Sequence, residues 1–307
     1  MPDLKQILDE IKNVEENGTS VDIVRRKYIR ELSEYRKRNV IVYYSNWLQN
    51  PNVPENAISD MDINGFMTTI HEMDTSMGLD LILHTPGGEL AATENIVNYL
   101  RTIFSCDIDV FVPQLAMSAG TMIACSCRKI YMGKQSSLGP IDPQFYIPGV
   151  GQVAALGIIE EIERALNEIK VRPESQVFWA NIFQKYNPTF IGKCEKAIEW
   201  STQITAEWLK NCMFEKDPDA ELKAKNVIDK IASHIETKSH RRHLSIQKCK
   251  EIGLKIEDLE QDQKLQDLVL SIHHSCMATF HNPTIIKIIE NQKNKLFMTK
   301  IAIEKRF

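Results

Sequence analysis

The sequence predicts an α/β fold in which helices flank a parallel β-sheet on both faces. Short apolar, β-branched runs indicate buried strands, and they alternate with longer segments whose apolar residues recur every three or four positions, as in helices. Successive strands are separated by enough chain for a helical crossover, which parallel neighbours require. The 307 residues are 43% hydrophobic, which is sufficient for a well-packed core. We expect an N-terminal helical arm, residues 1–38, ahead of one large domain, residues 39–307.

The first elements follow from changes in the period of the apolar residues. Residues 3–37 have helical spacing over two segments, which predicts the two helices of the arm. The β-branched and aromatic run "NVIVYY", at 39–44, predicts the first strand. The next helix begins at a capping-box-like pair, Ser59 and Asp62.

Three more strands follow, and turns and helices connect them. The run "LDLILH" ends in "TPGG" ahead of a helical pattern at 89–104, and Ser118 begins the helix that follows the third strand. These strands are predicted at 79–84, 107–113 and 128–132.

The second half of the chain is mainly helical, beginning with a helical region at 153–236. Apolar spacing of three and four residues predicts helices at 158–170, 174–185, 190–213, 217–236, 245–253 and 262–278. The tail "TIIKIIENQKNKLFMTKIAI" fits either a hairpin or a helix, and its periodicity does not distinguish the two.

Composition excludes several classes of partner. The net charge of −4, without a long run of one sign, gives no electrostatic basis for binding nucleic acid or an anionic membrane. Seven scattered cysteines are typical of a reducing compartment, so we expect a cytoplasmic protein. The charged N-terminus does not resemble a secretory signal, and no apolar stretch approaches the roughly 18 residues of a spanning helix.

Two loops at successive strand ends carry the most informative residues. Gly87 and Gly88 lie between a strand and a helix, where backbone N–H groups and the helix dipole favour negative charge. Ser118 begins the next helix, and the N–H of Ala119 would point the same way. A lone N-cap serine or a lone Pro-Gly-Gly turn is usually structural, but carboxyl ends of parallel strands meet at one edge of a sheet. The pair therefore predicts an oxyanion hole beside a hydroxyl, as acyl transfer requires.

The runs "HTPGG", "AMSAGTMIA" and "SSLGPIDPQF" resemble the superfamily of Clp proteases and signal-peptide peptidases, which has the ClpP/crotonase fold. Together with "NVIVYYSNWLQ", "ETKSHRRHLSIQKCKEIGL" and "DQKLQDLVL", they resemble more closely the archaeal and bacterial serine dehydrogenase proteinase family. This resemblance implies a serine peptidase with Ser118 as the nucleophile. It also implies that Gly87, Gly88 and Ala119 donate to the oxyanion.

The resemblance leaves the general base open. Where Clp proteases have their histidine, this chain has Asp142, and the stretch that corresponds to their aspartate is "HRRHLS". The two partners are therefore exchanged, and we predict Asp142 with His240, or with His243, in the order Ser, Asp, His. Signal-peptide peptidases use a lysine instead, and the helix that would carry it has none at "VAALGII". Lys134 is the remaining candidate for such a base.

Other possible sites are weaker. Cys125 and Cys127 with His273 and His274 lack the paired spacing of a zinc site, so we expect no metal. "GKQSS" lacks the first glycine and the hydroxyl residue of a phosphate loop, and we expect no cofactor. His84, at the end of the second strand, is expected to fill polar space there.

The favoured function is an ATP-independent serine peptidase that acts on peptides or unfolded proteins. Crotonase-type acyl-CoA chemistry on the same fold and a catalytically inactive oligomeric scaffold are the alternatives. Relatives of this fold assemble into rings or stacked trimers, and the helices of 158–236 offer surfaces for contact, so we predict a homo-oligomer.

Overall fold

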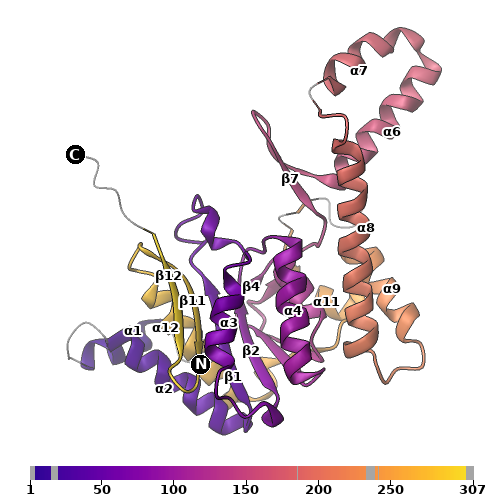
Figure 1. Ribbon diagram of the computed structural model, residues 1–307. Coiled ribbons are helices and arrows are strands. Elements are labelled where there is room, and N and C mark those ends of the chain that lie inside the picture. The colour runs from indigo at the N-terminus through magenta and orange to yellow at the C-terminus, as the bar shows by residue number, and fades with distance from the viewer. Residues whose placement is uncertain (1–3, 15–19, 185, 233–238, 241, 302–307) are drawn as a thin grey trace, which may run out of the picture.

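The computed structural model describes residues 4–14, 20–184, 186–232, 239–240 and 242–301. It confirms the α/β class, with a seven-stranded, mostly parallel sheet covered by helices on both faces (Figure 1). The strand order is β10-β5-β3-β2-β1-β11-β12. The strands are β1 (Asn39–Ser45), β2 (Leu79–His84), β3 (Ile108–Val112), β5 (Lys129–Met132), β10 (Ile256–Asp258), β11 (Ile285–Asn291) and β12 (Leu296–Lys300).

The four predicted strands form the centre of this sheet and run parallel, together with β10. Most of their residues are apolar because both of their faces are covered. The sequence of the tail fitted either a hairpin or a helix, and the structure has the hairpin. β11 pairs antiparallel with β1 and with β12. The short edge strand β10 has only three residues, too few for a period, and sequence analysis missed it.

Successive residues of β1 point to opposite faces of the sheet. Val40 and Val42 contact the cluster under α2 and α12, whereas Ile41 and Tyr43 contact the larger cluster on the other face. The first face is covered by α2 (Ser20–Arg36) and α12 (Gln263–Thr279), and α1 (Leu4–Asn13) packs beside them. The second face is covered by α3 (Asp62–Ile70), α4 (Leu90–Phe104), α5 (Ala119–Cys125), α9 (Ala220–Ile231) and α11 (Ile246–Ile252).

The two helices predicted for the arm are α1 and α2, and α2 buries Ile29 and Leu32 against the sheet. The arm is therefore in contact with the core, and its boundary at residue 38 stays a prediction. None of the helices in the described part of the chain combines the length and apolarity that crossing a membrane requires.

A projection extends from the body and carries much of the predicted helical region (Figure 1). It consists of the hairpin β7 (Gln144–Ile147) and β8 (Gly151–Ala154) and the helices α6 (Ala155–Val171), α7 (Gln176–Phe183) and α8 (Phe190–Trp208). Ala155, Ile158 and Cys194 form a small core of its own. The N–H of Ile141 donates to the carbonyl of Ile231 at 3.1 Å, where the chain leaves the body and where α9 ends. Of the helix predicted at 217–236, residues 233–236 lie outside the described residues.

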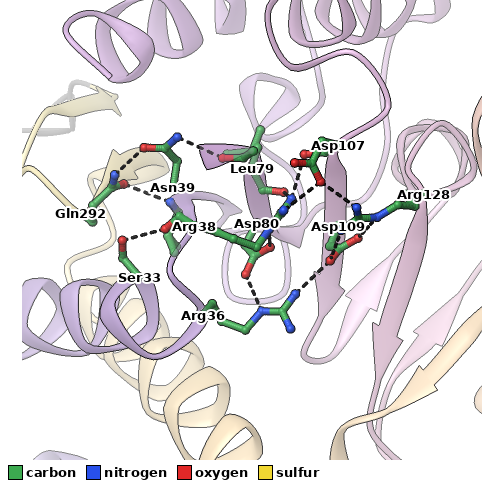
Figure 2. Close-up of polar contacts among 12 residues, drawn as sticks. Ser33, Arg36, Arg38, Asn39, Leu79, Asp80, Asp107, Asp109, Arg128 and Gln292 are labelled. Carbon is green, nitrogen blue, oxygen red and sulfur yellow. Dashed lines mark hydrogen bonds and ion pairs between the residues drawn. The ribbon is translucent and has the colours of Figure 1, made fainter. Parts of the chain in front are cut away.

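Paired charges close the end of the sheet at which the parallel strands begin (Figure 2). Asp80, at the start of β2, accepts from Arg36 Nε at 2.8 Å and from Arg38 Nε at 2.6 Å. Asp109, in β3, accepts from Arg128 Nε at 3.0 Å. Because Arg36 ends α2, the network fixes that helix to the central strands.

Candidate active site

Ser118 occupies a strained turn at the opposite end of the sheet. The two-residue strand β4 (Leu115–Ala116) leads into this turn, and α5 begins directly after it. The backbone of Ser118 has φ 53° and ψ −118°, a conformation that costs a non-glycine residue about 1–3 kcal/mol. Although Ser118 is in the N-cap position, its side chain makes no capping hydrogen bond, and the residue is partly exposed. The turn therefore holds the hydroxyl outside the helix cap.

The glycine turn after β2 packs directly against Ser118. Gly87 has φ 99°, and a methyl group added to it would lie 2.7 Å from Ser118 Cβ and 3.0 Å from the nitrogen of Ala119. The two turns are also joined through their backbones, since Thr85 donates to Leu115 O at 3.1 Å. Only glycine permits both the conformation and the close approach at position 87.

The segment around Ile58 decides which N–H groups of the glycine turn are free. Ile58 donates to Gly87 O at 2.8 Å, and Glu89 donates to Ile58 O at 2.9 Å. In this parallel bridge the N–H of Gly88 faces away from Ile58. The N–H of Gly87 donates to Thr85 Oγ1 at 3.2 Å. In the described part of the chain, the N–H groups of Gly88 and Ala119 donate to no protein acceptor.

A buried ion pair supports this segment from behind. Lys287 Nζ donates to Ala57 O at 2.8 Å and to both oxygens of Asp62, at 2.8 and 2.9 Å. Asp62 also accepts from Tyr43 Oη at 2.9 Å and from the N–H of Ser59 at 3.0 Å, which is one half of the predicted capping box. Burial lowers the pKa of Lys287. These contacts fix the segment around Ile58, which pairs with Gly88.

A second, three-stranded sheet gathers the predicted catalytic segments. Its order is β4-β6-β9, with β6 at Ser137–Leu138 and β9 at Leu244–Ser245. β4 and β6 are parallel and β9 is antiparallel to them, so the end of β4, the end of β6 and the start of β9 lie at one edge. Ser118 follows β4, Asp142 follows β6, and His240 precedes β9, each within four residues.

At this edge His240 and Asp142 form a hydrogen-bonded pair. His240 Nδ1 lies 2.8 Å from Asp142 Oδ1, and the second carboxylate oxygen accepts from Gln144 Nε2 at 2.8 Å. The side chain of Asp142 is 2% exposed and that of His240 is 21% exposed. A carboxylate at Nδ1 makes that nitrogen the protonated one in the neutral imidazole, so Nε2 carries the lone pair. The pair thus has the form of a base held by a buried acceptor.

Thr121 fixes the chain around Asp142 against the Ser118 turn. Its hydroxyl donates to Ala116 O at 2.9 Å and accepts from the N–H of Gly139 at 2.9 Å. A methyl group on Gly139 would lie 3.3 Å from the nitrogen of Ser118. The strand end that leads to Asp142 therefore runs alongside the serine.

The alternative bases lie in more exposed surroundings. His243 is exposed, and the structure pairs Asp142 with His240 instead. Lys134 is exposed in the loop after β5, where its backbone N–H donates to Glu260 Oε1 at 2.8 Å. Both residues are exposed, in contrast to the partly buried pair of His240 and Asp142.

Of the other residues singled out in the sequence, His84, His273, Cys125 and Cys127 are buried, and His274 is partly buried. Burial lowers the pKa of His84 to about 4, and its ring packs against Tyr44 and His273. Cys125 and Cys127 are fully buried. Within the described ranges, no group of three or more His, Cys, Asp or Glu side chains is arranged to hold a metal ion.

Sequence analysis missed the residues that position the site. Thr121 and Gln144 lie within the runs that carry the family resemblance, which gave them no role, and Lys287 lies outside those runs. The roles of Thr121 and Lys287 come from contacts between segments far apart in the chain. Only the proximity of Gln144 to Asp142 in the sequence was a usable signal.

Comparison with known proteins identifies the family of this chain. The family model of the ClpP-like SDH-type serine proteinases matches residues 14–294. Two uncharacterized proteins of Methanocaldococcus jannaschii are similar in sequence. MJ1495 is 29% identical over 235 residues, covering 76% of this chain and 71% of that protein. MJ0137 is 33% identical over 147 residues, covering 47% of this chain and 49% of that protein.

Two solved structures of the membrane-bound stomatin-specific protease 1510-N have lower similarity. One mutant has a TM-score of 0.41 and 16% identity, covering 69% of this chain and 79% of the other. A second mutant, in complex with a substrate peptide, has a TM-score of 0.39 and 18% identity, covering 65% and 70%. Because the family model spans nearly the whole sequence, the chain belongs to the family of ClpP-like SDH-type serine proteinases.

Proposed function

We propose that this chain hydrolyses peptide bonds through an acyl-enzyme on Ser118, with His240 as the general base and Asp142 as its partner. One observation carries the proposal: the 2.8 Å contact between His240 and Asp142 lies at the edge of the small sheet where the Ser118 turn also lies. The membership of the chain in a serine proteinase family supports the reaction class.

In the proposed mechanism His240 acts first as a base and then as an acid in each half-reaction. Ser118 Oγ attacks the carbonyl carbon while His240 Nε2 accepts its proton, and Asp142 stabilises the imidazolium that forms. His240 then protonates the leaving amine, and water releases the acyl group by the reverse route. Asp142 stays ionised throughout.

The proposed oxyanion hole consists of two N–H groups, those of Gly88 and Ala119. Both lack a protein acceptor among the described residues, and Ala119 is the first residue of α5, where the helix dipole favours negative charge. Gly87 contributes through its close packing on Ser118, since its own N–H is directed at Thr85 Oγ1.

We also propose that the protein acts as a homo-oligomer on peptide or unfolded substrates. Val171, Val177 and Phe178 are exposed on the projection, at and around α7, and exposed apolar side chains that cluster in this way favour contact with another chain. Light scattering tests the assembly, and a monodisperse monomer at micromolar concentration would contradict it.

A fluorophosphonate probe tests the catalytic proposal. We expect covalent labelling of Ser118 in the folded protein, identified by mass spectrometry of the digested chain. Ser118→Ala removes both the labelling and peptide hydrolysis, whereas Ser76→Ala, at an exposed serine, retains them. A folded protein that is never labelled would favour the inactive scaffold, and tight binding of coenzyme A would favour acyl-CoA chemistry.

A further inference from the structure

Two thiols meet at the end of the sheet opposite Ser118. Cys106 lies in the turn between α4 and β3, and Cys212 lies in the π-helix Leu209–Met213 that continues α8. Cys212 Sγ lies 3.7 Å from Cys106 O, and both thiols are free. Since β3 begins just after Cys106 and its carboxyl end leads toward Ser118, the thiol pair and the proposed active site are at opposite edges of the sheet.

The surroundings of Cys106 favour its thiolate. A hydrogen bond with the Cys212 thiol and the Arg101 guanidinium, whose Nη2 lies 3.4 Å from Cys106 Sγ, lower the pKa of Cys106 to about 6 against the opposing effect of burial. Cys106 is also partly exposed, so a small oxidant can reach it. Cys212 is buried, and its pKa is raised by the same hydrogen bond and by burial, so it stays protonated beside the thiolate.

The five remaining cysteines differ from Cys106 in exposure and in the pKa of the thiol. They are all buried, and burial is the first cause that raises the pKa of each one. These residues are Cys125, Cys127, Cys194, Cys249 and Cys276. Reactive cysteines combine an accessible thiolate with a neighbouring cation, and a second thiol nearby converts the first oxidation product into a disulfide.

We propose that Cys106 and Cys212 are a peroxide-responsive redox pair, in which Cys106 is the attacking thiolate and Cys212 the resolving thiol. The geometry that carries this is the position of Cys106 Sγ, which accepts from the Arg101 guanidinium at 3.4 Å and lies beside the π-helix that contains Cys212. In the protonated form the Cys106 thiol donates to Asn211 O at 3.3 Å. π-Helical turns are rare and are often found at functional positions. The oxidant is hydrogen peroxide.

The reaction has two balanced steps. The Cys106 thiolate attacks one peroxide oxygen, the O–O bond breaks, and hydroxide leaves and takes up a proton to become water. Cys212 then attacks the sulfenic sulfur, the S–S bond forms, the S–O bond breaks, and the proton of the Cys212 thiol leaves with hydroxide as a second water. The two thiols lose two electrons together, and hydrogen peroxide is reduced to two waters.

The disulfide would join the body to the base of the projection. Cys106 belongs to the turn beside the charge network, next to Asp107, whereas Cys212 follows the helix α8 that carries the projection (Figures 1 and 2). Oxidation would therefore attach the C-terminal end of α8 covalently to the start of β3. It would leave the chemical groups around Ser118 unchanged.

The first experiment counts thiols in the full-length protein after treatment with hydrogen peroxide, followed by alkylation under denaturing conditions. We expect the loss of two of the seven thiols, a peptide cross-link between Cys106 and Cys212, and full recovery with dithiothreitol. Cys194→Ser, on α8 outside the pair, behaves as the wild type. Cys106→Ser abolishes the cross-link, and Cys212→Ser leaves a sulfenic acid on Cys106 that dimedone traps. A cross-link to Cys127, or a sulfinic acid on Cys106 beside a free Cys212, would overturn the proposal.

The second experiment measures the rate of iodoacetamide alkylation of Cys106 against pH. The wild type should have its midpoint near the pKa of about 6, and Arg101→Gln should shift the midpoint upward while Arg101→Lys restores it in part. Arg172→Gln, at an exposed position on the projection, is the matched control. A wild-type midpoint near the ordinary cysteine value of about 8.5 would contradict the proposal. Ser118→Ala leaves both experiments unchanged, so the redox proposal and the peptidase proposal fail independently.

Discussion

The two ends of the central sheet are built differently. Where the parallel strands begin, charged side chains pair with one another, and the buried Asp80 is held by Arg36 and Arg38 (Figure 2). Where the strands end, Ser118 keeps a positive φ, and in the described part of the chain the N–H of Gly88 has no protein acceptor. The first end contributes stability through paired charges, whereas the second leaves polar groups unpaired, as the proposed reaction requires.

The largest expected effect is at the carboxyl end of the sheet. Asp142→Asn removes the carboxylate that holds the proton on His240 Nδ1, so Nε2 is no longer the accepting nitrogen. We expect peptide turnover to fall by about 10⁴-fold with an unchanged thermal unfolding curve. The measurement is kcat on a fluorogenic peptide, with Asp60→Asn, at an exposed aspartate, as the control. A loss smaller than about tenfold would remove Asp142 from the mechanism.

Gly88→Ala tests the second donor of the proposed oxyanion hole. The added methyl group would collide with the backbone of Ile58, so the glycine turn must move away from Ser118. We expect kcat/KM to fall by about 10²–10³-fold, as for the loss of one oxyanion donor. Gly192→Ala is the matched control because a methyl group there meets no atom within 4 Å. Equal activities of the two variants would show that the turn has no part in catalysis.

At the edge of the sheet where the parallel strands begin, we expect substitutions of paired charges to lower stability without lowering activity. Asp80→Asn leaves two arginines without their shared carboxylate, and we expect the free energy of unfolding to fall by about 3 kcal/mol. Asp107→Asn should have a smaller effect because that side chain is 42% exposed. Urea unfolding measures both, and kcat per folded molecule should not change. A loss of kcat in Asp80→Asn at full folding would contradict the separation of the two ends.

His84, at the carboxyl end of β2, makes this end sensitive to acid. Its pKa is about 4 in the folded protein, against about 6.5 in an unfolded chain, so between these values only the unfolded chain binds the proton. The free energy of unfolding is therefore unaffected above pH 6.5 and falls by up to about 3 kcal/mol as the pH drops to 4.

Urea unfolding at several pH values checks this dependence. His84→Phe should reduce the slope between pH 6.5 and 4, while the exposed His71→Gln should not. Burial also lowers the pKa of His273, so part of the slope should remain in His84→Phe. An identical slope in wild type and His84→Phe would show that this imidazole does not contribute.

The smallest expected effect is at Lys134. Its side chain is exposed, and substitutions at such positions change free energies by only about 0.5 kcal/mol. Lys134→Ala should therefore keep peptide turnover within about twofold of the wild type. A large loss of both turnover and Ser118 labelling, in a folded protein, would favour a serine–lysine dyad over the pair formed by His240 and Asp142.

The sequence predicted the elements whose periods are long enough to detect. The central strands have apolar runs of three to five residues, and the crossover helices have apolar residues at regular helical spacing. The glycine and serine turns follow from the ends of those strands. β4, β6 and β9 have two residues each, so no period exists to detect. Because those short strands bring His240 beside Asp142, the choice between His240 and His243 depended on tertiary contacts that local sequence does not encode.

The hydrogen bond between Ile141 and Ile231 bears on how far the projection can vary in length. It joins the point where the chain departs for the projection to the end of α9, the body helix that follows the return along α8, so the excursion begins and finishes at one place. The entropy of closing such a detour changes only slowly with its length. Lengthening, trimming or exchanging the outer segment therefore leaves the spacing of the inner framework intact. The length of the projection can thus change while the central sheet stays the same.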